Sequence, residues 1–191
     1  MRAAGTLLTA ALAVVTAAGA LAQHAHRQDM PGAPQPYAGQ QQRPVASLSA
    51  EELQGFLEGR GMGLAKSAEL NGYPGPVHVL QLERELRLSA HQRAHVEQVF
   101  QKMQARAAEL GRQYIDAERS VDAAFKSSAA ADTSTISARV LEASRILGEL
   151  RLAHLEAHVE ITPLLTPEQR ARYAELRGYS DPAAHPQTHK H

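Results

Sequence analysis

The sequence contains no cysteine and no tryptophan, and only 4% of its residues are aromatic. The protein must therefore be stable without disulfide bonds. So few aromatic side chains argue against a large globular core and against surfaces that stack nucleic-acid bases. The formal net charge is zero, so no basic field favours nucleic acid or an anionic membrane. We expect no nucleic-acid partner.

The first 22 residues have the pattern of a secretory signal peptide. Arg2 provides a positive start, residues 7–18 are apolar, and Ala20-Leu21-Ala22 offers the small residues that a signal peptidase reads. We therefore predict cleavage after Ala22 and a periplasmic protein without stable membrane insertion. An uncleaved anchor is the alternative, but the apolar run is short for a hydrocarbon core of roughly 30 Å.

The remaining chain divides by composition into three parts. Residues 23–46 are rich in Gln, Pro, Gly and His without apolar periodicity, which predicts a disordered leader. Residues 47–179 are dominated by strong helix formers and predict one helical domain. Short helices are expected after Ser49, over residues 64–70, and from Pro76 to Leu86. Residues 180–191 form a polar tail.

Two long heptad patterns predict the centre of the fold. Because a short polar turn at residues 127–131 joins them, the two helices must pack antiparallel. The fold class is thus all-α: a long antiparallel helical hairpin with short flanking helices, the last from Thr166 to Arg177. A thin helical layer leaves apolar surface, which favours a homodimer. The seam residues are Val96, Phe100, Met103, Ala107, Leu110, Tyr114, Ala117, Val121 and Ala124, then Ile136, Val140, Ala143, Leu147, Leu150, His154, Ala157, Ile161 and Leu164.

Two pentapeptides share the chemistry of a helix start. In each, a leucine precedes a hydroxyl residue that caps the helix, and a glutamine three positions later reaches back to the cap's own N–H. Good helix starts need no further function, but two copies in one exported helical chain are more specific. The motif residues are Leu88, Ser89 and Gln92 in the first copy, and Leu165, Thr166 and Gln169 in the second.

This repeated LTxxQ motif resembles the Spy/CpxP and heavy-metal-resistance group of bacterial envelope proteins. The resemblance covers residues 48–179 and is most specific over residues 154–179, while Ser89 departs from the usual threonine. It implies a long bent hairpin, often dimerised into a shallow cradle, with a periplasmic stress role. Some members of the group are ATP-independent chaperones, some restrain a sensor kinase, and some sense or buffer transition metals.

Histidine pairs are the best local clue to function. His91 and His95 are four residues apart, as are His154 and His158, so each pair projects from one helical face. Two imidazoles at this spacing suit one divalent transition ion such as Ni, Co, Cu or Zn. The resemblance implies the same, because a nickel and cobalt sensor branch uses helical histidine pairs with Glu and Met.

The hairpin register limits which residues share a site. With the turn near residue 130, His154 lies level with about Arg106, so the two pairs do not form one four-histidine site. Met103 and Glu109 lie near that level and are candidate further ligands.

Two structural alternatives to metal binding stay open. His154 occupies a seam position that often holds a packed, hydrogen-bonded histidine, and His91 lies in a first turn where solvation is ordinary.

Histidines outside the pairs are weaker candidates. Those in the two ends of the chain can scavenge metal, but flexible polar tails need no function. His78 follows a Pro-Gly break and has no evident partner in the sequence. The end histidines are His24, His26, His185, His189 and His191.

Catalysis is not expected. The segment from His154 to His158 differs from the HExxH zincin helix in the position of its glutamate, and no nucleophile motif is present. The sequence therefore favours a non-enzymatic, metal-responsive periplasmic stress protein. The alternatives are an ATP-independent chaperone that holds unfolded clients and a regulator of a membrane sensor kinase.

Overall fold

A computed structural model describes residues 35–126 and 132–180, and this part of the chain contains helices and no strand. The predicted signal peptide, most of the predicted leader, the turn at 127–131 and residues 181–191 lie outside the described residues. The chain divides into two compact units, Met1–Ala38 and Gly39–His191, and the second is described below. No helix in the described residues has both the length and the apolarity of a membrane span.

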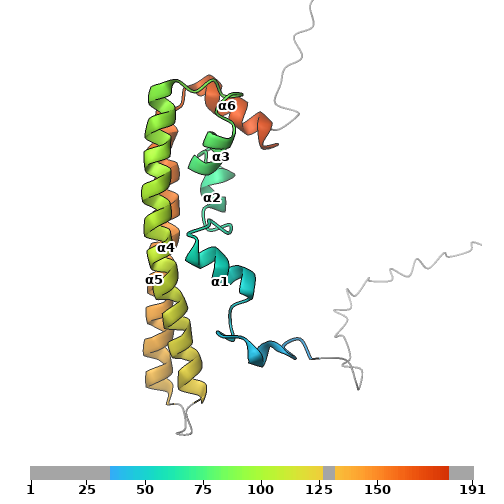
Figure 1. Cartoon of the computed structure of the whole chain (residues 1–191), viewed down its shortest axis with the longest axis vertical. Helices are drawn as coiled ribbons and strands as arrows, with labels where there is room; N and C mark the ends of the chain where they lie inside the picture. The colour runs from blue at the N-terminus through green and yellow to red at the C-terminus, as the bar shows by residue number, and fades with distance from the viewer. Residues whose placement is uncertain (1–34, 127–131, 181–191) are drawn as a thin grey trace, which may run out of the picture. The chain divides into compact units, whose positions relative to one another are not determined.

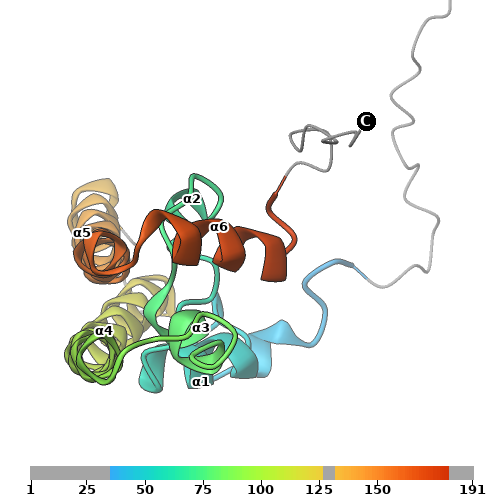
Figure 2. The same ribbon diagram turned by 90° about the horizontal axis from the view of Figure 1, so that it is seen from above.

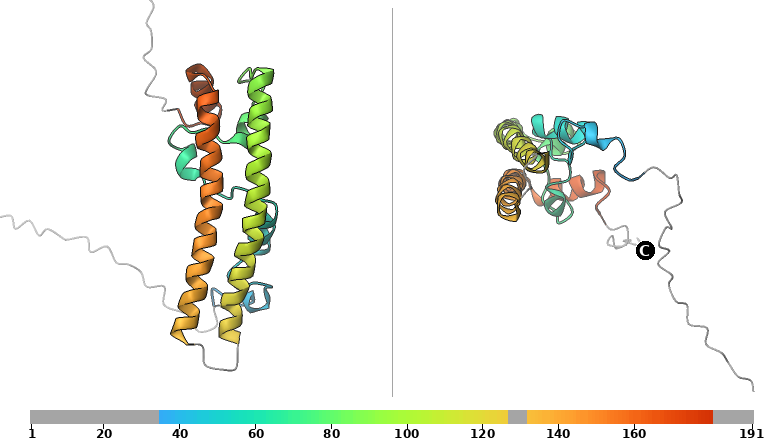
Figure 3. Two further views of the ribbon diagram at one scale, coloured as in Figure 1. Left: turned by 90° about the vertical axis from the view of Figure 1, so that its left-hand side faces the viewer. Right: turned by 90° about the horizontal axis from the view of Figure 1, so that it is seen from below.

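Two long helices lie antiparallel and side by side, α4 (Ala90–Lys126) and α5 (Thr133–Ile161) (Figure 1; Figure 3, left). The α5 helix begins where the Asp132 side chain accepts a hydrogen bond from the N–H of Thr135. All-helical architecture built on long helices is thus confirmed for the described residues. The antiparallel arrangement follows from the short connection between two amphipathic helices.

Short helices form a second layer on one side of α4 and α5, as Figure 2 shows from above. The α1 and α3 helices pack against α4, whereas α2 packs against α5. The α6 helix follows α5 after a one-turn 3₁₀ helix, η2. These elements are η1 (Gln40–Gln42), α1 (Ala50–Leu57), α2 (Lys66–Glu69), α3 (Pro76–Gln81), η2 (Thr162–Leu164) and α6 (Pro167–Leu176).

The core consists of two apolar clusters. One joins α1 to the middle of α4 and α5 through residues such as Phe56, Leu110 and Leu150. The other joins α3 and α6 to the opposite end of the hairpin through residues such as Val79 and Ile161. On α5, His154 lies between Leu150 of the first cluster and Ala157 of the second.

The structure differs from the sequence prediction in the buried face. Val140 is 43% exposed although it was assigned to the seam, whereas Val99, Ile115 and Ile146 are buried without being assigned to it. The α1 and α3 helices cover a second side of α4, so its buried stripe is wider than one heptad seam. Val140 lies near the hairpin turn, away from the segments that these short helices cover.

Packing also extends into the last residues of the predicted leader, residues 23–46. Val45 is fully buried, and the backbone N–H of Ala46 donates to Asp122 at 2.6 Å. Near α3, the helix expected to reach Leu86 ends at Gln81. The following turn leaves the Leu86 carbonyl free to accept a hydrogen bond from α6.

Candidate functional site

Both predicted capping boxes are present. The Ser89 hydroxyl accepts from the N–H of Gln92 at 3.1 Å, and the Gln92 side chain accepts from the N–H of Ser89 at 2.9 Å. Thr166 and Gln169 repeat the same pair of bonds at 3.2 and 2.9 Å. Each box satisfies two N–H groups that a helix start would otherwise leave unpaired.

The two boxes also join one another. The Gln92 amide donates to the Gln169 side-chain oxygen at 2.8 Å, and the Gln169 amide donates to the Gln92 oxygen at 3.1 Å. The same two amides reach the Leu164 carbonyl at 2.7 Å and the Leu86 carbonyl at 3.1 Å. The motif therefore fastens the start of α4 to the start of α6, which neither pentapeptide shows alone.

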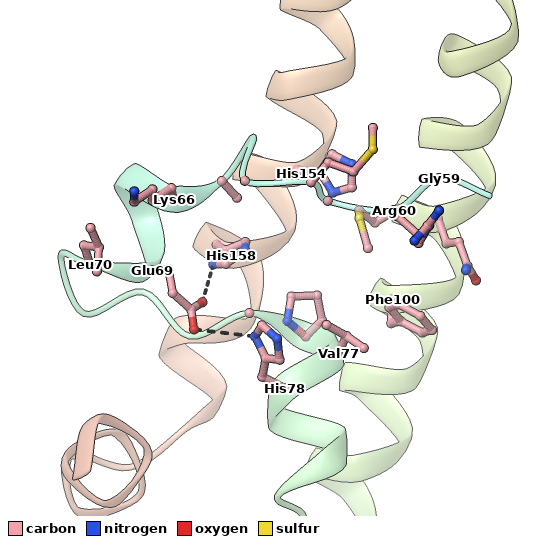
Figure 4. A pocket seen from close by; sticks show the side chains of 18 of the residues that line it. Gly59, Arg60, Lys66, Glu69, Leu70, Val77, His78, Phe100, His154 and His158 are labelled. Carbon is pink, nitrogen blue, oxygen red and sulfur yellow. Dashed lines mark ion pairs between the residues drawn. The ribbon is translucent and has the colours of Figure 1, made fainter. Parts of the chain in front are cut away.

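A cavity of about 600 Å³ lies between the short helices and the hairpin. Figure 4 shows its side chains arriving from α2, α3, α4 and α5. Most of the lining is apolar, and its polar groups come from several of these elements. Residues from separate elements that line it include Glu69, His78, Phe100, Met103, His154 and His158.

His158 has a fixed tautomer in this cavity. Its Nδ1 lies 2.8 Å from the carbonyl oxygen of Tyr73. Because a carbonyl only accepts, Nδ1 carries the proton and donates, which leaves Nε2 with a free lone pair. Gly75 keeps this side of the ring accessible, because a Cβ there would lie 3.2 Å from Nε2 and 2.9 Å from Cε1.

His154 lies one turn earlier on the same face of α5 and is only 4% exposed. His154 is thus packed at this seam position, but its Nε2 is buried without a hydrogen-bond partner. Burial, with a smaller effect from neighbouring His158, lowers the pKa of His154 from 6.5 to about 4. Its imidazole is therefore neutral at neutral pH.

Glu69 contacts residues from several elements around the cavity. Its carboxylate lies 3.5 Å from Nδ1 of His78 and 3.8 Å from Nδ1 of His158, as the dashed lines in Figure 4 show. It also accepts from the Tyr173 hydroxyl and lies 3.3 Å from Nε of Arg177, both on or just after α6. Burial and the Arg177 charge lower the pKa of His78, although Glu69 opposes the shift.

The comparison with protein families matches the model described as "LTXXQ motif family protein" over residues 77–177. The chain belongs to the LTXXQ motif family. The match includes both capping boxes, which are hydrogen-bonded to one another, and the helices between them. In this chain, the motif that suggested the family therefore also connects α4 to α6. Comparison with curated proteins and with solved structures returns no significant match.

The structure of this LTXXQ chain separates the predicted metal ligands into two groups. His154, His158 and Met103 line one cavity. His91 and His95 lie in the first two turns of α4, with ring centroids 6.3 Å apart, and neither lines that cavity. Glu109 is likewise not part of the lining and instead bonds to Arg106 and Gln113 on its own helix.

Glu69 was missed as a candidate, and His78 was considered only as a weak one. The sequence showed no partner for His78, and nothing marked Glu69, because their contacts depend on how α2 and α3 fold onto α5. Even with these residues, no three His, Asp or Glu side chains within residues 35–126 and 132–180 are placed to hold one metal ion. The described residues alone therefore do not provide three such ligands for a metal ion in this cavity.

Proposed function

We propose that this protein is a periplasmic, non-catalytic stress protein that responds to a divalent transition ion bound in the cavity. The ligands in this proposal are Nε2 of His154 and Nε2 of His158. The observation that carries it is a pair of imidazoles on one face of α5, in which Nε2 of His154 is buried and unpaired and Nδ1 of His158 is bonded to the Tyr73 carbonyl. A buried polar atom without a partner costs roughly 1–3 kcal/mol, so a ligand that pairs it has a reason to bind.

The chemistry of the donors suits Ni²⁺, Co²⁺, Cu²⁺ or Zn²⁺. Neutral imidazole is a common ligand for these ions, and the lowered pKa of His154 keeps its nitrogen unprotonated. The bond from His158 Nδ1 to Tyr73 is the type of outer contact that orients a ligating ring. Met103 offers a thioether in the same cavity, and Glu69 offers a carboxylate beside His158.

Calorimetric titration of the purified protein with each ion tests this proposal. We expect one site per chain and at least tenfold weaker binding in His154→Ala and His158→Ala. The matched control is His95→Ala, which removes an imidazole from α4 outside the cavity and leaves that site intact. Equal affinity in the cavity variants and the wild type would refute the proposal.

A chaperone role is the second candidate, favoured by apolar side chains around the cavity. Met62, Leu70, Tyr73 and Val77 are all exposed beside its polar groups. Such a surface can make weak contacts with unfolding proteins, and these contacts do not require a nucleotide. An aggregation assay with a denatured client and a chelator separates the two roles, because a metal-free protein that fully suppresses aggregation favours the chaperone.

A further inference from the structure

The cavity between the short helices and the hairpin is much larger than a metal ion requires. Its volume of about 600 Å³ lies within the range of roughly 300–1,000 Å³ that is typical of sites for small organic molecules. Such sites are mainly apolar, and a small number of polar groups orient the ligand. The lining of this cavity follows the same pattern. An organic molecule therefore fits a volume that an ion alone leaves unfilled.

Apolar side chains from two adjacent helices line the cavity. Val77 comes from α3, and Phe100 and Met103 come from successive turns of α4 (Figure 4). An aromatic ring offers a large hydrophobic contact area, and a thioether adapts to groups of varied shape because it is unbranched and polarizable. This part of the lining favours a ligand with a hydrophobic body.

His158 provides the polar group whose hydrogen-bonding role is best defined. Its Nδ1 donates to the Tyr73 carbonyl at 2.8 Å, so in the neutral ring Nε2 accepts and does not donate. Gly75 leaves room beside this nitrogen, because a Cβ at that position would lie 3.2 Å from Nε2. A ligand that pairs with Nε2 must therefore carry a hydroxyl or N–H donor.

The charged side chains of the lining are paired or exposed. Arg60 forms an ion pair with Glu58 at 3.0 Å, and Glu69 lies 3.3 Å from Arg177. Lys66 is exposed to solvent. A charged ligand buried among these described residues would have to break one of the pairs or stay without a buried counter-charge, which is costly. The charges of the lining thus favour a neutral ligand.

We propose that the cavity binds a neutral, mainly apolar organic molecule that donates one hydrogen bond to Nε2 of His158. The hydrophobic body of the ligand packs against Phe100 and Met103, and the donor fixes its orientation. This inference goes beyond the proposed function and does not depend on it. The organic ligand needs the cavity volume and His158, whereas the ion needs both His154 and His158.

Fluorescence titration of the purified, chelator-treated protein with two probes tests the proposal. The first probe, 2-naphthalenemethanol, carries a hydroxyl donor, and the second, 2-ethylnaphthalene, has nearly the same shape without one. Tryptophan emission does not overlap with the naphthalene signal, because the sequence contains no tryptophan. The wild type should bind the alcohol about three- to tenfold more tightly than the hydrocarbon, which is the usual effect of one hydrogen bond.

One pair of variants tests the hydrogen bond to the ligand. His158→Leu removes the acceptor and keeps an apolar side chain in its place, so the preference for the alcohol should disappear. His154→Leu is the matched control, because it makes the same change one turn earlier on α5 and should retain the preference. An equal loss of preference in both variants would overturn the assignment to His158.

A second pair of variants tests the cavity itself. Gly61 lines it, and a Cβ there would meet only the His154 ring, at 3.9 Å, so a larger side chain takes up ligand volume. Gly61→Leu should weaken the binding of both probes by roughly fivefold or more. Gly148→Leu is the control, because a Cβ at Gly148 meets nothing within 4 Å, and it should change affinity by less than about twofold.

The comparison of the two probes on the wild type needs no variant, so it decides the matter even if a variant misfolds. Equal affinity of the wild type for both probes, or a preference that persists in His158→Leu, overturns the proposal. Affinity unchanged by Gly61→Leu places the probes outside the cavity and also overturns it. Weakened ion binding in His154→Ala and His158→Ala would still support the proposed function, so the two proposals fail separately.

Discussion

His154 occupies a helix seam where an apolar side chain would pack without an unpaired polar atom. The pKa of His154 is lowered from 6.5 to about 4, chiefly by burial. Between these two values the unfolded chain binds more protons than the folded protein, so the free energy of unfolding falls as pH is lowered through this window. Above about pH 6.5 this contribution is constant.

Replacing His154 with leucine therefore has two expected effects. His154→Leu flattens the fall in unfolding free energy between pH 6.5 and 4, which in the wild type reaches about 1–3 kcal/mol from this residue. It also stabilises the protein at neutral pH by about 1 kcal/mol, because the unpaired Nε2 is removed. Urea denaturation across the pH range measures both, with His95→Leu as the control. A lower stability of His154→Leu at neutral pH would contradict this account.

Gln92 and Gln169 are expected to be energetically coupled, because each amide pairs with the other and with a backbone carbonyl. Gln92→Ala and Gln169→Ala each cost about 1–3 kcal/mol, and the double variant costs less than their sum by about 0.5–2 kcal/mol. Denaturant unfolding of all four proteins completes the cycle. Gln101→Ala, whose side chain bonds only along α4 to Glu97, is the control and changes stability by less than about 0.5 kcal/mol. Additive losses would show that the two motifs act as separate caps.

Among the helices, the contact between α1 and α4 depends on a residue without a side chain. A Cβ on Gly111 would lie 2.1 Å from the Phe56 carbonyl oxygen, whereas a Cβ on Gly148 of α5 would meet nothing within 4 Å. Gly111→Ala should cost about 1–3 kcal/mol despite the better helix propensity of alanine. Gly148→Ala should stabilise by about 0.5–1 kcal/mol. Thermal unfolding of the two variants compares them, and equal shifts would contradict the close contact.

The elements that the sequence predicted well are those governed by local signals. Ser89 and Thr166 start helices because capping is decided within four residues, and the heptad patterns predicted the two long helices α4 and α5, although not their whole buried face. The cavity was only half predicted. The spacing of His154 and His158 was visible, but Glu69, which faces His158, and His78, which faces Glu69, lie on short helices without a periodic pattern. Their placement depends on tertiary contacts that no local rule encodes.

For the whole molecule, the outer face of α5 carries an apolar stripe. Leu141, Leu152 and Val159 are 66%, 51% and 59% exposed and lie on one helical face, since their spacings of eleven and seven residues are close to whole turns. This stripe supports the predicted homodimer, with a second copy covering it. Sedimentation velocity should show a wild-type dimer and a monomeric Leu152→Glu. Leu57→Glu is the control, because Leu57 is exposed on α1 and not on the stripe, and this variant should remain a dimer. A monomeric wild type would contradict the prediction.

The central claim is that two imidazoles of α5 hold a transition ion through their Nε2 atoms. Long-range ¹H–¹⁵N spectra of the histidine rings, recorded with and without Zn²⁺, test it most directly. The account predicts that the ¹⁵N chemical shift of Nε2 changes to that of a metal-bound nitrogen in both His154 and His158. Nδ1 of His158 should keep its proton and its hydrogen bond to the Tyr73 carbonyl. Zinc-dependent shifts confined to His91, His95 or the terminal histidines, with His154 and His158 unchanged, would contradict it.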